Sequence, residues 1–313
     1  MTITQLKYVL AVAEHQNFTK AAAHVFVTQP TLSMQIQKLE EELSILIFDR
    51  SKKPIELTEV GEKIVNQARN IVNESERMQD VVDQEKGFIG GNFRLGIIPT
   101  VMPTLLPMFL KSFIKKYPKV HLKIEELTTA EIIIKLNDGH LDAAIAATPL
   151  VQEKIKERVL YFEPFVGYVP LNHRLNSKKH LDRSDLDIND ILLLEDGHCF
   201  RDGVINICKS LKHNAAIDSF QVESGSFETL IKLSNEGFGM TLLPYLNTLD
   251  IPKEEQKKYL RYFNEPSPAR EVSLLYRKSE LKMQIIDSLY DIIASIIRGA
   301  ITFQDIKIIS PLK

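Results

Sequence analysis

The two cysteines of this 313-residue chain, Cys199 and Cys208, lie nine positions apart, and the first is flanked by His198 and Arg201. Two cysteines are too few for a structural disulfide framework in a chain of this length, so a regulated thiol pair is the sharper hypothesis. If the segment is helical, nine residues hold the two Cα atoms roughly 13 Å apart. A disulfide requires about 5.5–6 Å. Bonding the pair would therefore refold the backbone between them, as a switch requires.

Other interpretations of these thiols are open. Cys199, Cys208, His198 and His213 could be a metal cluster, but their spacing matches no common zinc pattern, and we expect no metal and no cofactor. A lone free cysteine is most often buried and inert. Arg201 and Asp202 could simply form a surface ion pair.

The bulk composition is that of an ordinary globular protein, with 44% hydrophobic and 26% charged residues. The length predicts about two domains. The net charge of −2 gives no sign of a nucleic-acid partner, so motifs must carry any such interpretation. No signal-peptide pattern opens the chain, and no apolar run approaches the ~20 residues of a membrane span. We expect a cytoplasmic protein with no membrane association, in which a disulfide is transient.

Residues 1–58 predict three short helices followed by a hairpin. Helical spacing of apolar residues defines the first helix, by Leu6, Val9, Leu10, Ala13 and Phe18. The second lies around residues 19–23. The third spans 29–43, with Thr28 as its N-cap and Pro30 in its first turn. Its buried stripe is predicted to be Leu32, Ile36, Leu39 and Leu43. Strands over 45–48 and 55–57 flank a basic tip, which completes a winged arrangement.

Residues 58–85 predict one long helix without proline. Its apolar residues recur close to every 3.5 positions, at Val60, Ile64, Ala68, Ile71, Ser75, Met78 and Val82. Such a helix is most simply a dimerisation rod, and the alternative is a core helix of the following domain. Gly87, Gly90 and Gly91 then mark a hinge.

From residue 93 the pattern alternates between strands and helices. Strands are predicted over 93–98, 120–127, 141–147, 165–169, 191–194, 219–222 and 272–276, and helices over 100–116, 130–137, 227–235 and 284–298. This alternation predicts a parallel sheet with helices on both faces, arranged as two lobes. Gly237 and Gly239 are predicted to form a helix-to-strand turn.

The N-terminal segment resembles the LysR-type transcriptional regulators. The matching residues, in order, are Phe18-Thr19, Ala21-Ala22, Thr28 to Ser33, Gln35-Ile36, Leu39-Glu40, Phe48, Arg50, Leu57-Thr58 and Gly61. The resemblance implies an α/β protein with an N-terminal winged helix-turn-helix (1–58), a long linker and dimerisation helix with a hinge (59–89), and a two-lobed effector domain like the periplasmic binding proteins (90–313). Ser44 stands where the family usually ends its recognition helix with glycine, which favours a left-handed residue there.

Within that family, the phrase around Cys199 is similar to the OxyR-type sensors of hydrogen peroxide. The similarity covers residues 96–100, 194–199, 201–202, 208, 226–230 and 237–244. It implies that Cys199 is the peroxidatic residue and Cys208 the resolving one, joined in a reversible disulfide. It also implies that a pocket is lined or supported by Thr100, Thr129, His198, Arg201 and Asp202. A cation such as Arg201 would lower the pKa of the attacking thiol, and Thr100 lies where α/β folds place ligands.

The resemblance also implies contacts with double-stranded operator DNA by the helix-turn-helix at about residues 18–37 and by the wing. The expected residues are Gln29, Pro30, Thr31, Ser33, Gln35, Lys38, Arg50, Lys52 and Lys53. The implied partners are a second copy through the linker helix, a homotetramer, RNA polymerase and a cytosolic dithiol reductant. Two alternatives to a peroxide-responsive regulator are open: a metabolite-sensing regulator with incidental cysteines, and a thiol peroxidase, which the DNA-binding segment disfavours.

Overall fold

The computed structural model describes residues 1–85, 89–208, 224–301 and 306–309. Backbone contacts divide the chain into two compact units, Met1–Phe88 and Ile89–Lys313. The first unit has one hydrophobic core and the second has two, one in each lobe. Among the helices of the described ranges, none is long and apolar enough to cross a membrane.

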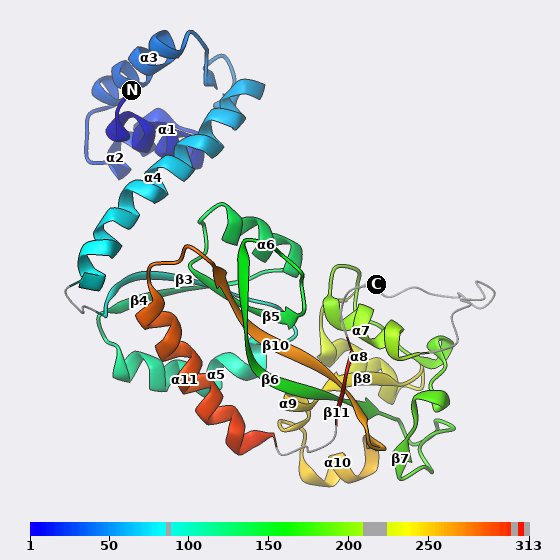
Figure 1. Cartoon of the computed structure of the whole chain (residues 1–313). Coiled ribbons are helices and arrows are strands. Elements are labelled where there is room, and N and C mark those ends of the chain that lie inside the picture. The colour runs from blue at the N-terminus through cyan, green and yellow to red at the C-terminus, as the bar shows by residue number, and fades with distance from the viewer. Residues whose placement is uncertain (86–88, 209–223, 302–305, 310–313) are drawn as a thin grey trace. The chain divides into compact units, whose positions relative to one another are not determined.

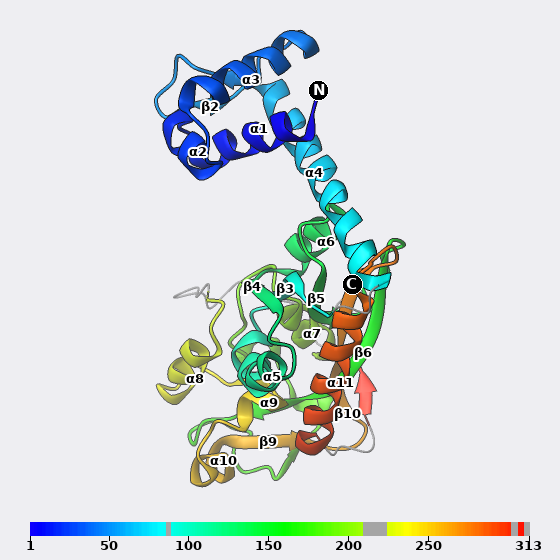
Figure 2. The same cartoon turned by 90° about the vertical axis from the view of Figure 1, so that its left-hand side faces the viewer.

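The first unit is a three-helix head with a hairpin and a long helix, as predicted (Figures 1 and 2), but the first hairpin strand is Phe48–Asp49 and not the predicted 45–48. Strands β1 and β2 pair antiparallel. The elements are α1 (Ile3–His15), α2 (Phe18–His24), α3 (Gln29–Leu43), β1 (Phe48–Asp49), β2 (Glu56–Leu57) and α4 (Glu59–Glu85).

Local caps fix where the helices of the head begin and end. The side chain of Thr28 accepts a hydrogen bond from the backbone N–H of Thr31, which confirms the predicted N-cap. Ser44 ends α3 with φ 55°, the expected left-handed conformation. The assignment of Phe18 to the first helix is wrong. Gln16 ends α1 in the left-handed region and Asn17 caps α2, so Phe18 opens the second helix.

The buried face of α3 carries a carboxylate as well as apolar residues. Leu32, Ile36 and Leu39 are fully buried, as predicted, whereas Leu43 in the last turn is only half-buried. Glu40 is also buried, and its Oε1 accepts hydrogen bonds from the backbone N–H groups of Ile47 and Phe48 at 2.8 and 3.2 Å. The carboxylate of Glu40 therefore attaches β1 to α3.

The long helix α4 has two different halves. Val65, Ala68 and Val72 are buried in the core of the first unit, so the alternative of a core helix of the following domain is wrong. Farther along, Met78 is 72% exposed, and Val81 and Val82 are also exposed. The first half of the helix therefore completes the head, and the second half presents apolar side chains to solvent.

The second unit is built on one mixed nine-stranded sheet. Its strands are β3 (Gly91–Ile97), β4 (Val120–Glu126), β5 (Ala143–Thr148), β6 (Ile155–Tyr168), β7 (His180–Leu181), β8 (Thr241–Pro244), β9 (Leu260–Phe263), β10 (Ser267–Arg277) and β11 (Ile306–Ile308). The main path runs β4-β3-β5-β10-β6-β9-β7, with β8 paired to β6 and β11 to β10. The prediction of parallel pairing holds for β3 with β4 and β5, but β10 is antiparallel to both β5 and β6.

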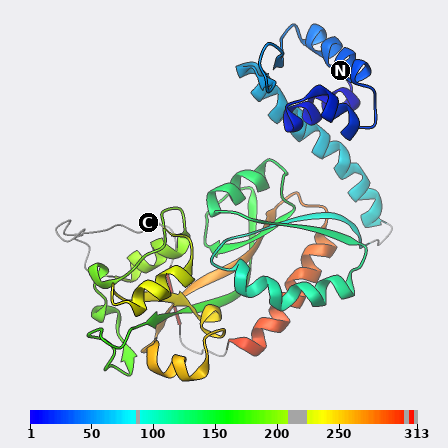
Figure 3. The ribbon, with the colours of Figure 1, turned by 180° about the vertical axis from the view of Figure 1, so that it is seen from behind.

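The helices of the second unit cover the sheet lobe by lobe. They are α5 (Met102–Lys116), α6 (Thr129–Asn137), α7 (Cys199–Ile207), α8 (Phe227–Asn235), α9 (Tyr245–Thr248), α10 (Lys253–Tyr259) and α11 (Met283–Ala300). In the first lobe, α5 and α11 cover one face of the sheet and α6 covers the other (Figures 1 and 2). The long strands β6 and β10 run from one lobe into the other (Figure 3). Residues on these two strands can therefore contact both lobes.

Several sequence predictions for this unit need correction. The strand predicted over 165–169 is only the end of the 14-residue β6, and β10 begins five residues before the predicted start. The strand predicted over 191–194 is wrong, because only Ile191 forms an isolated bridge, to Met240. The Gly237 and Gly239 turn is confirmed by positive φ angles of 89° and 135° between α8 and β8. The predicted strand over 219–222 and the hinge residue Gly87 lie outside the described residues.

Gly61 allows the first turn of α4 to approach the hairpin closely. A Cβ at this position would lie 2.0 Å from the carbonyl oxygen of Ile47. The same turn is fixed by Thr58, whose Oγ1 accepts a hydrogen bond from the N–H of Gly61 at 2.9 Å and donates one to the carbonyl of Leu46 at 2.7 Å. The junction between the wing and the long helix therefore requires glycine.

We expect Gly61→Ala and Gly299→Ala to change stability in opposite directions. Both residues are helical, but a Cβ at Gly299 meets nothing within 4 Å. The first substitution should destabilise by about 1–3 kcal/mol through overpacking against backbone, and the second should stabilise by up to about 1 kcal/mol through helix propensity. Differential scanning calorimetry of the two full-length variants checks this. Equal effects would contradict the close approach.

Candidate functional site

The two cysteines lie at the two ends of helix α7. Cys199 is the first residue of the helix and is half-buried, whereas Cys208 is its C-cap and is 1% exposed. Both are free thiols. The segment between the cysteines is therefore helical, which was the condition for a switch. The helical rise holds the Cα atoms of Cys199 and Cys208 about 13 Å apart. A disulfide between them requires α7 to unwind.

The helix also places the two thiols in different surroundings. Cys199 packs against the hydrophobic core of the first lobe, whereas Cys208 belongs to the core of the second lobe. Burial raises the pKa of Cys208 to about 11, with a smaller contribution in the same direction from the charge of Asp187. Cys208 is therefore a neutral, unreactive thiol near neutral pH, because the thiolate is the nucleophile.

The sulfur of Cys199 has a hydroxyl donor from the opposite lobe. Thr129, the first residue of α6, places its Oγ1 3.5 Å from Sγ of Cys199. Among the described residues, this is the only hydrogen bond to that sulfur. Such a donor stabilises a thiolate, as does the N-terminal position of Cys199 in α7, where the helix dipole favours negative charge.

Thr100 lies at the end of β3, where the sequence placed it, and it is fully enclosed. Its hydroxyl and its carbonyl oxygen accept hydrogen bonds from the guanidinium of Arg270, at 2.8 and 3.1 Å. Its hydroxyl is therefore occupied by Arg270, and it has no hydrogen bond to the sulfur of Cys199 within the part of the chain that the structure describes.

Three further predicted residues surround the start of α7 and shape the loop before it. His198 is buried, and its Nε2 lies 3.4 Å from Oε1 of Glu195. Arg201 donates to the carbonyl of Leu194 at 2.8 Å and pairs with Asp196 at 2.8 Å. Asp202 is half-buried in the first turn of the helix. Arg201 therefore binds the preceding loop, and its ion pair is with Asp196 and not with Asp202.

Sequence reasoning missed a buried ion pair that lies between the cysteine helix and the first lobe. Arg270 of β10 faces Glu163 of β6 in the strand register, and its Nε and Nη2 contact Oε2 of Glu163 at 2.9 and 2.7 Å. Both side chains are buried. The signal was present in the sequence, because a charged residue in a buried strand requires a partner, but the predicted strand began after Arg270.

The same arginine connects Thr100 to the residue that follows Cys199. Its Cζ lies 5.1 Å from the centre of the Phe200 ring, in cation–π geometry. Phe200 also contacts the rings of Phe165 and Phe227, with ring centroids 4.8 and 5.1 Å apart. A movement of α7 would therefore change contacts of Arg270, which is bonded to the first lobe through Thr100.

The predicted DNA-contacting residues of the head differ in how free they are. Ser33 and Gln35 are half-buried, and the other members of the set are exposed: Gln29, Pro30, Thr31, Lys38, Arg50, Lys52 and Lys53. Arg50 is engaged within the head: it pairs with Glu40 at 2.8 Å, donates to Ser33 at 3.3 Å, and lies over the ring of Phe18. Arg50 therefore holds the wing against the recognition helix.

Within the described ranges, Cys199, Cys208 and His198 belong to no group of ligand atoms close enough to share an ion. His213, the fourth member of the alternative metal cluster, lies outside the described residues.

Comparisons with known proteins agree with this architecture. Residues 3–62 match the family model of the bacterial regulatory helix-turn-helix protein, lysR family, and residues 86–295 match the LysR substrate binding domain. The chain is 33% identical to the hydrogen peroxide-inducible genes activator of Pectobacterium carotovorum and 32% identical to the DNA-binding transcriptional dual regulator OxyR of Escherichia coli K12, in each case over 88% of this chain and 90% of the other.

Solved structures give the same result. Full-length OxyR of Pseudomonas aeruginosa, a cysteine-to-aspartate variant, is 34% identical with a TM-score of 0.75, covering 94% of this chain and 98% of that one. A hydrogen-peroxide-bound mutant of Corynebacterium glutamicum OxyR is 27% identical with a TM-score of 0.63, covering 96% and 93%.

The buried thiol of Cys208 should make stability fall at alkaline pH. The unfolded thiol ionises near the ordinary pKa of 9.0, whereas the folded thiol resists ionisation up to about 11. The stabilising contribution is therefore fully present below pH 9 and is lost as the pH rises through 11. In a Cys199→Ser background, Cys208→Ala should remove about 1–2 kcal/mol of that alkaline loss. Urea unfolding at pH 8.5 and 10.5 measures it; an identical loss in both proteins would contradict the burial effect.

Removal of the Arg270 charge should leave the carboxylate of Glu163 buried and uncompensated. We expect Arg270→Met to destabilise the second unit by about 3–5 kcal/mol. The exposed pair of Lys232 with Glu228 provides the control, because Lys232→Met should cost less than about 1 kcal/mol. Adding Glu163→Gln to Arg270→Met should recover part of the loss. Chemical unfolding checks this, and a small loss for Arg270→Met would refute the pairing.

Proposed function

The chain belongs to the LysR family of bacterial transcriptional regulators, in its OxyR branch, and we propose that it is activated by hydrogen peroxide through a reversible Cys199–Cys208 disulfide. It is a DNA-binding regulator of oxidative-stress genes and not an enzyme. The observation that carries the redox mechanism is the pair of free thiols at opposite ends of α7, of which, among the described residues, only Cys199 has a hydroxyl donor on its sulfur.

In the first step the thiolate of Cys199 attacks one oxygen of hydrogen peroxide. The sulfur gives two electrons, an S–O bond forms, the O–O bond breaks, and hydroxide leaves and takes a proton to become water. The product is a sulfenic acid. Thr129, whose hydroxyl already lies against the sulfur, would stabilise the thiolate before attack and orient the peroxide. Thr100, His198, Arg201 and Asp202 would support this pocket through the loop and strand ends that carry them.

In the second step Cys208 attacks the sulfur of the sulfenic acid. An S–S bond forms, the S–O bond breaks, and the oxygen leaves as water with the proton of Cys208. The raised pKa and burial of Cys208 keep it inactive while α7 is intact. The order of events therefore follows from burial: Cys199 is oxidised first, and Cys208 reacts only when the helix opens. A dithiol reductant in the cytoplasm would reverse the bond by thiol–disulfide exchange.

Helix α7 has features that would allow it to unwind. It is nine residues long, which is marginal for a helix without tertiary support. Gly203 in its middle costs about 1 kcal/mol relative to alanine, yet a Cβ there would lie 3.1 Å from the ring of Phe165. Packing of Phe200, Val204 and Ile207 holds the helix in place. Unwinding would release Phe200 from Arg270, and thereby alter the contact between the second lobe and Thr100.

The first unit would bind DNA and change its contacts with the operator when the second unit is oxidised. We assign residues 1–58 to DNA binding, 59–89 to the linker and dimerisation helix with its hinge, and 90–313 to redox sensing. Exposed apolar residues in the second half of α4, Met78, Val81 and Val82, support pairing with a second copy. Gln29, Pro30, Thr31, Ser33, Gln35 and Lys38 would enter the major groove, and Lys52 and Lys53 would meet phosphates. A tetramer and RNA polymerase complete the proposed assembly.

The reduced protein should lose both thiols on treatment with about one equivalent of hydrogen peroxide. Peptide mass spectrometry is expected to find a Cys199–Cys208 disulfide, because the sulfenic acid has one resolving thiol within the same segment. Cys199→Ser should abolish the reaction, whereas Cys208→Ser should stop at a sulfenic acid that a dimedone probe traps.

Footprinting of operator DNA by the reduced and oxidised forms then tests the output. Thiols that survive excess peroxide would refute the redox mechanism and favour the alternative regulator of this family, one that senses a small metabolite. A change in the footprint on oxidation, absent in Cys199→Ser, would support the proposal.

A further inference from the structure

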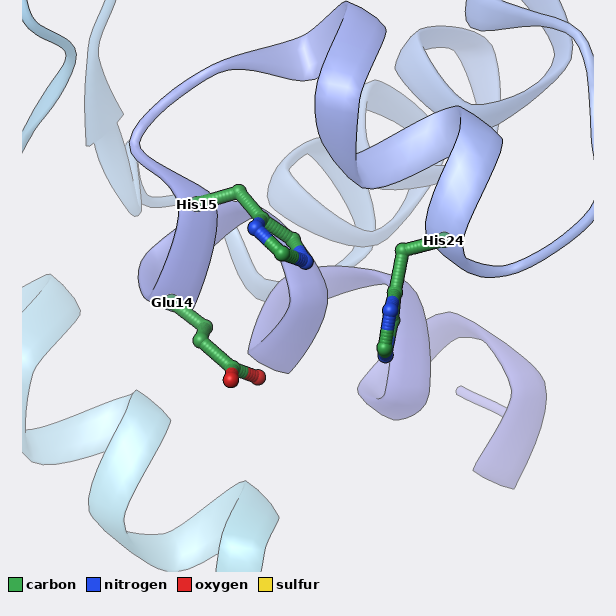
Figure 4. Close-up of side chains that lie close together, drawn as sticks. All are labelled: Glu14, His15 and His24. Carbon is green, nitrogen blue, oxygen red and sulfur yellow. The ribbon is translucent and has the colours of Figure 1, made fainter.

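Three potential metal ligands meet in the first unit, far along the sequence from the cysteines. Glu14 and His15 end helix α1, and His24 ends helix α2. One carboxylate oxygen and one nitrogen from each imidazole all lie within 4.8 Å of one another. Figure 4 shows the three side chains arranged around one space. We propose that this is a binding site for a single divalent transition-metal ion, Zn²⁺ foremost.

The distances are close to those of a coordination sphere. An ion at the centre of a triangle with 4.8 Å sides would lie about 2.8 Å from each corner, whereas Zn²⁺ bonds to nitrogen and oxygen are about 2.0–2.2 Å long. Each ligand atom would move by well under 1 Å. Glu14 and His24 are exposed, so small rotations of their side chains can supply this movement.

A second observation also indicates a ligand. Nε2 of His15 is shielded from solvent and has no hydrogen-bond partner among the described residues. The ring of His15 contacts the ring of His24 edge-on, and the two ring centroids are 4.9 Å apart. No other side chain therefore lies between the two imidazoles. A buried imidazole nitrogen without a partner is costly, and a metal bond would satisfy it.

The local field favours a cation. Both histidines lie in the last turn of their helices, where unpaired carbonyl groups give the helix end a partial negative charge. The carboxylate of Glu14 adds a full negative charge to the same place. The helix ends and the carboxylate therefore attract a positive ion electrostatically, in addition to any ligand bonds that the three side chains form with it.

The donor set selects the class of ion. Two imidazoles and one carboxylate suit Zn²⁺ and its neighbours in the transition series, whereas Mg²⁺ and Ca²⁺ prefer oxygen alone. Three protein ligands leave a fourth position for water. A bound ion would join the ends of α1 and α2, and so would stiffen the helices that precede the recognition helix. This site is independent of the redox mechanism, and its failure would leave that mechanism unaffected.

The test uses the full-length protein with Cys199→Ser and Cys208→Ser, so that no thiol competes for metal. Isothermal titration calorimetry with ZnCl₂ should give one site per chain in the micromolar range or tighter, and MgCl₂ should give none. Zn²⁺ in large excess over its Kd should raise the Tm by several degrees. Co²⁺ in place of Zn²⁺ should give the visible absorption of a tetrahedral or five-coordinate ion.

Single-residue variants decide whether the ion is held here. In the same background, His24→Ala and Glu14→Gln should each weaken Zn²⁺ binding by at least about tenfold, while the metal-free Tm stays unchanged because both side chains are exposed. His121→Ala, an exposed histidine on β4, is the matched control and should bind as the parent does. Absence of micromolar binding in the parent, or equal binding by His24→Ala and the parent, would overturn the proposal.

Discussion

The rise of an α-helix is the constraint on which the proposed mechanism of this protein depends. Helix α7 holds Cys199 and Cys208 about 13 Å apart and in different hydrophobic cores, so the two thiols cannot react while the helix exists. The reduced state is therefore maintained by the packing of one short helix. In the proposed mechanism, oxidation of one sulfur would change the fold because that helix is marginal, with a glycine at its centre.

The buried pair of Arg270 and Glu163 would connect the proposed unwinding of α7 to the rest of the second unit. The two residues lie on β10 and β6, the strands that run through both lobes. Arg270 contacts Thr100 on one side and Phe200 on the other, and Glu163 also accepts the backbone N–H of Leu246. The polar contacts of this group are buried, so the loss of one polar partner is energetically costly. Such a group has few intermediate arrangements, which suits a two-state response.

A comparable arrangement organises the head. The buried carboxylate of Glu40 on the recognition helix accepts two backbone N–H groups of the hairpin and pairs with Arg50. Arg50 in turn reaches Ser33, on the outward face of the same helix. One acidic residue inside the head therefore fixes the wing relative to the helix that would enter the major groove. Gly61 completes the junction, because its lack of a side chain lets the backbone of Ile47 pack closely against the first turn of α4.

The sequence by itself determined the helices of the head, the N-cap at Thr28, the left-handed Ser44, the long helix from Glu59, and the alternation of strands and helices that follows. These features depend on contacts within a few residues, and periodicity and capping report such contacts directly. The tertiary structure alone decided the antiparallel β10, the partner of Arg201, and the ion pair of Arg270 with Glu163. Those contacts join residues far apart in the chain, Arg270 and Glu163 being 107 positions apart. Pairing across such separations depends on the path of the whole sheet, which no local pattern encodes.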